Sequence, residues 1–401
     1  MWRKTLAALS AISGLALAQP TAYGAGADVI VGNLEGATVY ARAGGIAALA
    51  VGTVSCNAGD TVLQWNALPS NRHPVIGMNL YRLLDGRLEH VGQSWVKHGF
   101  TALQGNLCGN CRPNRDGQGL GVACSDPYGA GNNNGRNLRA RSEINQTTGY
   151  FDPTPMFDAQ RRQRVELPLV TPIDRGLQVA ESDLSVTNAR YFIEAHYVAA
   201  DDAEAGNGLN NTAYREIEIT RNAEGGYAIR NLQPTQRQGM AVQAWPGAKL
   251  ANLDSVEAEV QGRKFMSRIV VASRVTPLGN NRNRYDYAVY NMNSDRGVGS
   301  FSVAVGNTAV TNVGFKAVRS HGEKWSNDAW TPTTAAGRVT WSTAAAAANP
   351  NANAIRWGTT YNFWFEADGA PGQAAASVAR FKPGPIGGDA LQTTVDAPAP
   401  R

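Results

Sequence analysis

Five histidines give this chain its main capacity for metal chemistry, and four of them fall in the first half. His196 lies in an expected strand with Glu194 on the same face, because alternate residues of a strand share a face. Imidazoles from separate strands and loops are common copper and zinc ligands. We therefore expect His73, His98 and His196 to form a copper or zinc site. The alternative, separate histidines in ordinary hydrogen bonds, stays open because no His-x-His spacing links them.

A second group of ligand-type residues lies between positions 201 and 211, where acidic, amide and glycine residues are dense. Calcium takes roughly six to eight oxygen ligands, often from flexible loops. Asp201, Asp202, Glu204 and Asn207 are therefore candidate calcium ligands. Their spacing does not match the EF-hand pattern. The alternative is a polar hairpin loop that uses Asn and Gly for positive φ.

Aromatic residues suggest a third kind of chemistry, the stacking of sugar rings on tryptophan. Trp325 and Trp330 fall in an expected loop and are the candidate glycan-binding residues. Trp341 and Trp364 fall in expected strands, where we expect them in the core. Phosphate-binding loops, nucleotide fingerprints, nucleic-acid motifs and the zinc-protease helix motif are absent from the sequence. The glycine-flanked serine elbow of many hydrolases is absent as well.

The four cysteines, Cys56, Cys108, Cys111 and Cys124, are expected to form two disulfides, with three connectivities open. The Cys108-x-x-Cys111 pair lies in a loop rich in glycine and asparagine. A redox-active Cys-x-x-Cys pair would lie at the start of a helix that follows a strand. A zinc ribbon would need a second pair of cysteines close together in the sequence. The sequence therefore favours structural disulfides that staple a loop with little core of its own.

The first residues predict secretion to an extracellular or periplasmic compartment. A short basic head, an apolar run and Ala16-Leu17-Ala18 have the form of a signal peptide over residues 1–18. Removing Arg3 and Lys4 lowers the formal charge from +5 to +3, because 5 − 2 = 3. This charge is too small to indicate nucleic acid or an anionic membrane as a partner. No later apolar run is long enough for a transmembrane helix.

The fold class that the sequence predicts is all-β. Short β-branched or aromatic runs between Gly, Asn and Pro turns indicate a disulfide-stapled N-terminal β-sandwich-like domain over residues 26–245, with long loops. Seven expected strands over residues 262–383 predict an immunoglobulin-like β-sandwich, in which Tyr361 occupies the position of a tyrosine corner. Residues 249–260 are expected to form a short helix. The Pro/Ala/Gly-rich residues 384–401 are expected to form a disordered tail.

Several segments spread over the chain are distinctive. They include His73-Pro74-Val75-Ile76-Gly77-Met78-Asn79-Leu80-Tyr81-Arg82, Cys124-Ser125-Asp126-Pro127-Tyr128, Tyr287-Ala288-Val289-Tyr290-Asn291 and Arg356-Trp357-Gly358-Thr359-Thr360-Tyr361. Together they resemble a family of secreted bacterial two-domain β proteins, over nearly the whole mature chain. The resemblance implies a common two-part architecture and brings no activity with it.

Two functions remain open from the sequence. The first is a secreted metal-dependent enzyme with a histidine-liganded copper or zinc ion, whose pocket is shaped by the long loops of residues 108–164. The second is a non-catalytic surface or matrix module, stabilised by calcium, that binds a glycan or a protein. Long loops on a rigid β scaffold are common places for binding and catalytic residues, and this holds for both functions.

Overall fold

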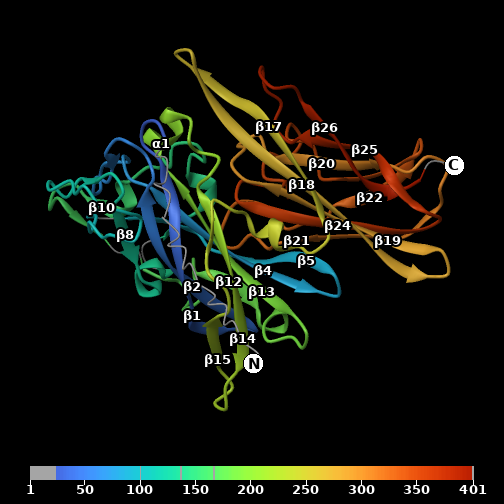
Figure 1. Ribbon diagram of the computed structural model, residues 1–401, viewed down its shortest axis with the longest axis horizontal. Helices are drawn as coiled ribbons and strands as arrows, with labels where there is room; N and C mark the ends of the chain where they lie inside the picture. Colours follow the sequence, from blue (N-terminus) through green and yellow to red (C-terminus); the bar gives the residue numbers. More distant parts are fainter. Residues whose placement is uncertain (1–23, 100, 136–137, 166–167, 400–401) are drawn as a thin grey trace, which may run out of the picture.

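The computed structural model describes residues 24–99, 101–135, 138–165 and 168–399. The expected signal peptide, residues 1–18, lies outside the described residues. The protein is 51% strand and 6% helix, which confirms the all-β class. No helix in the described part is long and apolar enough to pass through a lipid bilayer. Figure 1 shows two β-rich parts, the N-terminal part in blue to green and the C-terminal part in yellow to red.

The N-terminal part is built on one large antiparallel sheet. Its main strands, in spatial order, are β1 (Val29–Ala43), β2 (Ile46–Asn57), β12 (Leu177–Ala180), β5 (Arg87–Gln93), β4 (Val75–Leu84), β13 (Arg190–Val198), β14 (Thr212–Arg221) and β15 (Tyr227–Asn231). Four short strands extend it: β6 (Val96–His98), β8 (Ser125–Tyr128), β9 (Leu138–Arg139) and β16 (Gln236–Arg237). The β1–β2 turn uses Gly44 and Gly45, both with positive φ, as a tight hairpin turn requires.

Loops with little regular structure cover this sheet. They hold two small hairpins, β3 (Leu63–Gln64) with β7 (Gly119–Leu120), and β10 (Phe157–Asp158) with β11 (Gln163–Arg164). They also hold the short helix α1 (Ala200–Ala205) and 3-10 turns at Ala130–Asn133, Arg141–Glu143, Thr154–Met156, Glu181–Asp183 and Ala241–Ala244. The irregular stretch expected after Cys108 is therefore present, as short turns and strands.

The large sheet curls until β1 packs against β13 and β14 across a shared apolar core. Side chains fasten this closure, since Arg215 Nη1 donates to the Leu34 carbonyl at 2.6 Å and Arg237 Nε donates to the Gly32 carbonyl at 2.6 Å. The curled sheet therefore buries the apolar residues of β1 and β2 without needing a second independent sheet.

Two disulfides are present, as expected, and the structure selects one of the three connectivities. Cys56 pairs with Cys108, and Cys111 pairs with Cys124. Cys56 lies in β2, so the first bridge ties the loop to the large sheet, and the second closes the loop on itself.

The C-terminal part is a β-sandwich of two five-stranded antiparallel sheets. The first contains β17 (Lys249–Val260), β18 (Arg263–Gly279), β19 (Arg282–Asn291), β24 (Thr359–Asp368) and β21 (Val310–Ala317). The second contains β22 (Thr331–Ala335), β23 (Arg338–Ser342), β20 (Val298–Ala304), β25 (Pro371–Arg380) and β26 (Ala390–Pro398). The Tyr361 hydroxyl bonds to Asn353 Oδ1 at 2.5 Å and to the Ala354 carbonyl at 3.1 Å, as in a tyrosine corner.

The seven strands expected in this part are present, and two other expectations here are wrong. Residues 249–260 form strand β17 instead of a helix, and Ala390–Pro398 forms strand β26 instead of a disordered tail. Leu250, Leu253 and Val260 recur at helical spacing, but β17 is a largely exposed edge strand and its pairing with β18 decides its conformation. Strand β26 pairs with β25 along its whole length.

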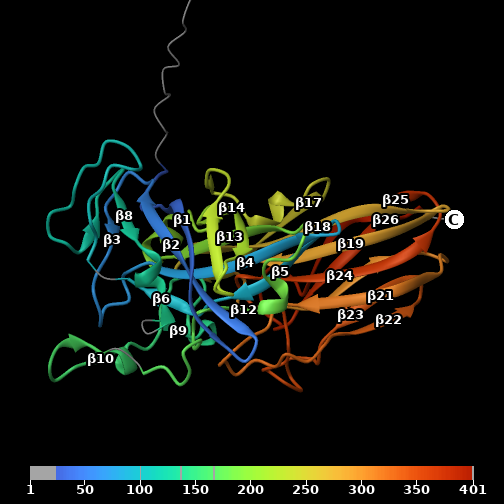
Figure 2. The same cartoon turned by 90° about the horizontal axis from the view of Figure 1, so that it is seen from below.

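The two parts share a buried apolar cluster, in which Tyr81 and Phe192 of the N-terminal part meet Val270 and Tyr290 of the sandwich. In Figures 1 and 2 the β4–β5 hairpin lies along the sandwich, next to β19 and β24. Asn79 Nδ2 donates to the Gly358 carbonyl at 2.9 Å across this boundary. The seam between the two parts is therefore packed and hydrogen-bonded.

Candidate functional site

The structure brings two of the three candidate metal-binding histidines together. The rings of His73 and His98 lie 4.6 Å apart between centroids, and His98 Nε2 lies 3.2 Å from the Ser70 carbonyl. His196 instead contacts the ring of Trp357, and burial lowers the pKa of His196 to about 3. In the described ranges, no three His, Cys, Asp or Glu side chains are grouped so that they could hold a metal ion. The three-histidine site is therefore not assembled.

The four candidate calcium ligands lie on and just after α1, and they face different partners. Asp201 Oδ2 accepts from the Gln64 amide at 2.7 Å, and Glu204 pairs with Arg72 and Arg263. Asn207 uses its amide nitrogen as a donor to the Ala25 and Ala27 carbonyls. Asp202 is fully buried beside the start of β1. As a set these residues do not converge on one point.

The two candidate glycan-binding tryptophans differ in exposure. Trp330 is 2% exposed and packs in the sandwich core against Phe315 and Tyr361. The expectation that Trp330 is an exposed stacking ring is therefore wrong. Trp325 is partly exposed at the seam, and the Arg356 guanidinium lies 5.0 Å from its ring centroid.

A groove runs along the seam between the two parts of the molecule. Its larger part has a volume of 590 Å³ and is lined by Ile144, Asn145, Gln146, Thr147, Thr148, Glu204, Glu257, Ala258, Val260, Phe265, Asp295 and Arg296. A smaller part of 200 Å³ is lined by Arg141, Ser142, Ile144, Asp295, Lys324, Trp325, Pro350, Asn351, Arg356, Trp357 and Lys382. The two parts share Ile144 and Asp295, so we treat them as one seam groove.

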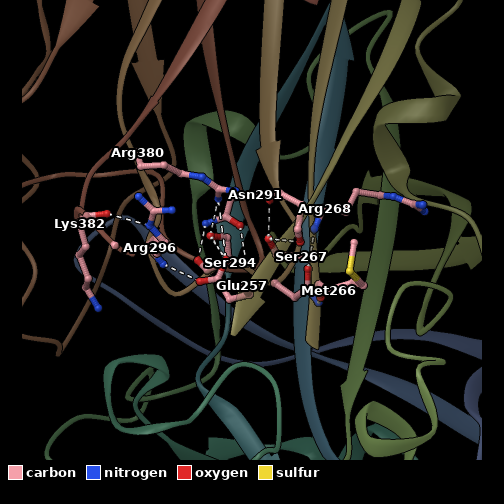
Figure 3. A network of polar contacts seen from close by, with 12 residues as sticks. Glu257, Met266, Ser267, Arg268, Asn291, Ser294, Arg296, Arg380 and Lys382 are labelled. Atoms are coloured by element: carbon pink, nitrogen blue, oxygen red, sulfur yellow. Dashed lines mark hydrogen bonds and ion pairs between the residues drawn. The ribbon is translucent and has the colours of Figure 1, made fainter. Parts of the chain in front are cut away.

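The sandwich wall of the seam groove is fixed by a buried polar network (Figure 3). Glu257, from β17, accepts hydrogen bonds from Ser294 Oγ at 2.8 Å and from the Arg296 amide at 3.0 Å. Arg380 lies 3.9 Å from Glu257, and both side chains are almost fully buried. The Arg296 side chain donates to the Lys382 and Ile386 carbonyls. These bonds hold the turn after β19 in place at the groove floor.

The opposite wall, residues 141–148, is anchored by the buried guanidinium of Arg141. Arg141 donates to the Ser94 carbonyl at 2.8 Å, to Asn79 Oδ1 at 2.9 Å and to the Gly358 carbonyl at 3.2 Å. Glu323, from the sandwich, accepts from the backbone amides of Arg141 and Ser142. The groove wall is therefore rigidly attached to both parts of the molecule.

The carboxylates that line the seam groove are all paired with basic side chains. Their partners within the chain are Arg72 for Glu204, Arg380 for Glu257 and Lys382 for Asp295. The lining also contains the basic residues Arg141, Arg296, Lys324 and Arg356. The remaining polar groups are amides and hydroxyls, which act as donors and acceptors for a polar ligand.

Sequence reasoning identified only Trp325 and Glu204 among the residues that line this groove. Glu257 was assigned to a helix, and Asn145 and Asp295 carry no motif. Residues 144–148, 257 and 295 lie far apart in the chain, and only the packing of the two parts brings them together.

No family model matches this chain, and the comparison with curated proteins found no match. Among solved structures, the chain is similar to a serine-rich repeat adhesion glycoprotein from Streptococcus agalactiae, with 9% identity and a TM-score of 0.21. The likeness covers 88% of this chain and 89% of that chain. A TM-score at this level carries no argument about function.

Proposed function

We propose that this protein is a non-catalytic extracellular module that binds a glycan in the seam groove. The observation that carries the proposal is the groove itself, a 590 Å³ hollow continued by a 200 Å³ hollow that holds the partly exposed Trp325. Ligand sites commonly have volumes of about 300–1,000 Å³. The volume of the larger part falls within this range.

The lining of the groove matches the chemistry of a sugar chain. Hydroxyl groups both donate and accept, so they pair well with the amides of Asn145, Gln146 and Asn351. The C–H face of a sugar ring packs on an aromatic ring, and Trp325 offers one at the end of the groove. Arg356 lies over this ring and restricts its orientation, which lowers the entropy lost on binding.

Extracellular location is part of the proposal. The two disulfides and the signal-peptide pattern of residues 1–18 both support it. The alternative function, a histidine-liganded copper or zinc enzyme, has less support, because His196 does not join His73 and His98 in a metal-binding group.

Glycan binding is tested by replacing Trp325 with alanine. We expect Trp325→Ala to lower the affinity for a bound oligosaccharide by about tenfold or more, since an aromatic contact is worth roughly 1–2 kcal/mol. Tyr40→Ala is the matched control, because Tyr40 is 41% exposed and lines neither part of the groove. Equal loss in both variants would contradict the proposal.

A further inference from the structure

Three buried oxygen atoms beside the start of β1 have no hydrogen-bond partner: Asp28 Oδ1, Asn210 Oδ1 and Asn211 Oδ1. Asp28 is 4% exposed and Asn211 is 2% exposed. Buried polar atoms are nearly always hydrogen-bonded, so these three orphaned oxygens require an explanation. They come from two segments, the residue before β1 and the loop between α1 and β14.

Hydrogen bonds place these oxygens next to two carboxylates. Asn210 Nδ2 donates to Asp28 Oδ2 at 3.3 Å, and Asn211 Nδ2 donates to Asp202 Oδ2 at 2.8 Å. Asp202 Oδ1 accepts from the Val29 amide at 2.9 Å. The adjacent residues Asn210 and Asn211 therefore each contact one of the two carboxylates, and Asp202 contacts the residue that follows Asp28.

The two carboxylates lack a compensating positive charge. Within the described ranges, neither Asp28 nor Asp202 forms an ion pair with a basic side chain. Burial raises the pKa of both carboxyls, that of Asp202 to about 8, and the charge of Asp28 raises the pKa of Asp202 further. Two buried carboxylates without a cation are costly in free energy.

We propose that Asp28, Asp202, Asn210 and Asn211 form a calcium-binding site that fastens the start of β1 to the loop after α1. All the protein atoms available are carboxylate and amide oxygens, the ligands that calcium prefers, and two carboxylates balance its charge. Zinc and copper favour nitrogen and sulfur ligands, and magnesium demands a stricter octahedral geometry. This set shares only Asp202 with the set suggested by the sequence.

A cation at this site would strengthen an attachment that backbone contacts already make between the loop after α1 and residues 25–28. Asn207, in the same loop, donates to the Ala25 and Ala27 carbonyls at 3.0 and 2.8 Å. The loop thus holds residues 25–28 through their backbone, and a cation would join the two segments through their side chains. The proposal is independent of the glycan proposal, because it rests on different atoms and is measured without a glycan.

The test is titration of the full mature chain, first stripped with EDTA, with calcium chloride in a calorimeter. We expect one calcium ion per chain and a higher melting temperature in millimolar calcium than in EDTA. Asp28→Asn keeps the shape of the side chain and removes one charge, so it should weaken calcium binding by about tenfold or more. Asp116→Asn is the control, because Asp116 bonds only within its own exposed loop.

Absence of calcium binding by the wild-type chain would overturn the proposal, and so would full affinity in Asp28→Asn. Equal stabilisation by magnesium chloride would overturn the choice of calcium. If Asp28→Asn does not fold, the comparison of the wild-type chain in calcium and in EDTA still decides the matter.

Discussion

At the residue scale, single buried side chains organise the seam. Arg141 is 1% exposed and bonds to carbonyl and amide oxygens of four residues in both parts of the molecule. Burial lowers the pKa of this guanidinium, yet arginine remains charged at any ordinary pH. The guanidinium donates hydrogen bonds to these oxygens, which compensate its burial. The buried arginine therefore positions one wall of the groove.

Removal of the Arg141 guanidinium should therefore destabilise the fold. We expect Arg141→Met to lower the free energy of unfolding by about 3 kcal/mol or more, because buried carbonyls lose their donors. Arg161→Met is the control, since the Arg161 side chain is 75% exposed and should change stability by less than about 0.5 kcal/mol. Urea unfolding of the three proteins measures both values, and similar midpoints for all three would contradict this role.

The buried carboxyl of Asp202 gives a pH-dependent stability in EDTA. Its folded pKa is about 8 against an ordinary value of 3.8, so between these values the folded state holds the proton more tightly. Stability therefore falls as pH rises toward 8. Asp28 and Asp201 face the same carboxyl, and His196 lines the cavity beside it.

The clearest window runs from about pH 7.5 to pH 8.5, where a histidine with an ordinary pKa of about 6.5 is at least roughly nine-tenths neutral in both states. His196, with a folded pKa of about 3, adds little slope there. We expect the free energy of unfolding in EDTA, measured by urea unfolding, to fall across this window, by at most roughly 1.4 kcal/mol per pH unit from Asp202. Calcium or Asp202→Asn should flatten the fall. An unchanged midpoint in EDTA would show that Asp202 ionises normally.

At the element scale, the disulfides and the edge strands determine how the long loops and sheets are held. The Cys56–Cys108 bridge closes a segment of 52 residues, and the Cys111–Cys124 bridge closes a segment of 13. A longer closed segment restricts the unfolded chain more, so the first bridge should stabilise the fold more.

The chain-entropy relation makes this difference measurable. We expect Cys56→Ala with Cys108→Ala to cost about 4 kcal/mol, and Cys111→Ala with Cys124→Ala to cost about 3 kcal/mol. Guanidinium unfolding of both double variants provides the comparison. A larger loss of stability from removing the Cys111–Cys124 bridge would mean that this bridge acts mainly by stabilising the folded loop, and not by restricting the unfolded chain.

Inner strands of the sandwich are predictable from sequence, and three of its four edge strands are not. Six of the seven expected strands are inner strands, the seventh is the edge strand β21, and Tyr361 marks a corner that the structure confirms. The edge strands β17 and β22 are largely exposed, and so is the first half of β26. Their conformation comes from backbone pairing with a neighbour, which leaves only a weak pattern in the sequence.

At the scale of the whole molecule, the site exists only where the two parts meet. Trp325 belongs to the sandwich and Asn145 to the N-terminal part, and the shared core of Tyr81, Phe192 and Tyr290 fixes their relative position. Sequence reasoning identified Trp325 from its loop context. It could not identify Asn145 or Asp295, because no local pattern reports a contact between residues 150 positions apart.

The most direct test of this account is a glycan array probed with the mature wild-type chain, Trp325→Ala and Tyr40→Ala. We expect the wild-type chain and Tyr40→Ala to bind the same oligosaccharides, and Trp325→Ala to bind them at least about tenfold more weakly. Failure of the wild-type chain to bind any glycan, or full binding by Trp325→Ala, would contradict the assignment of the seam groove as a glycan site.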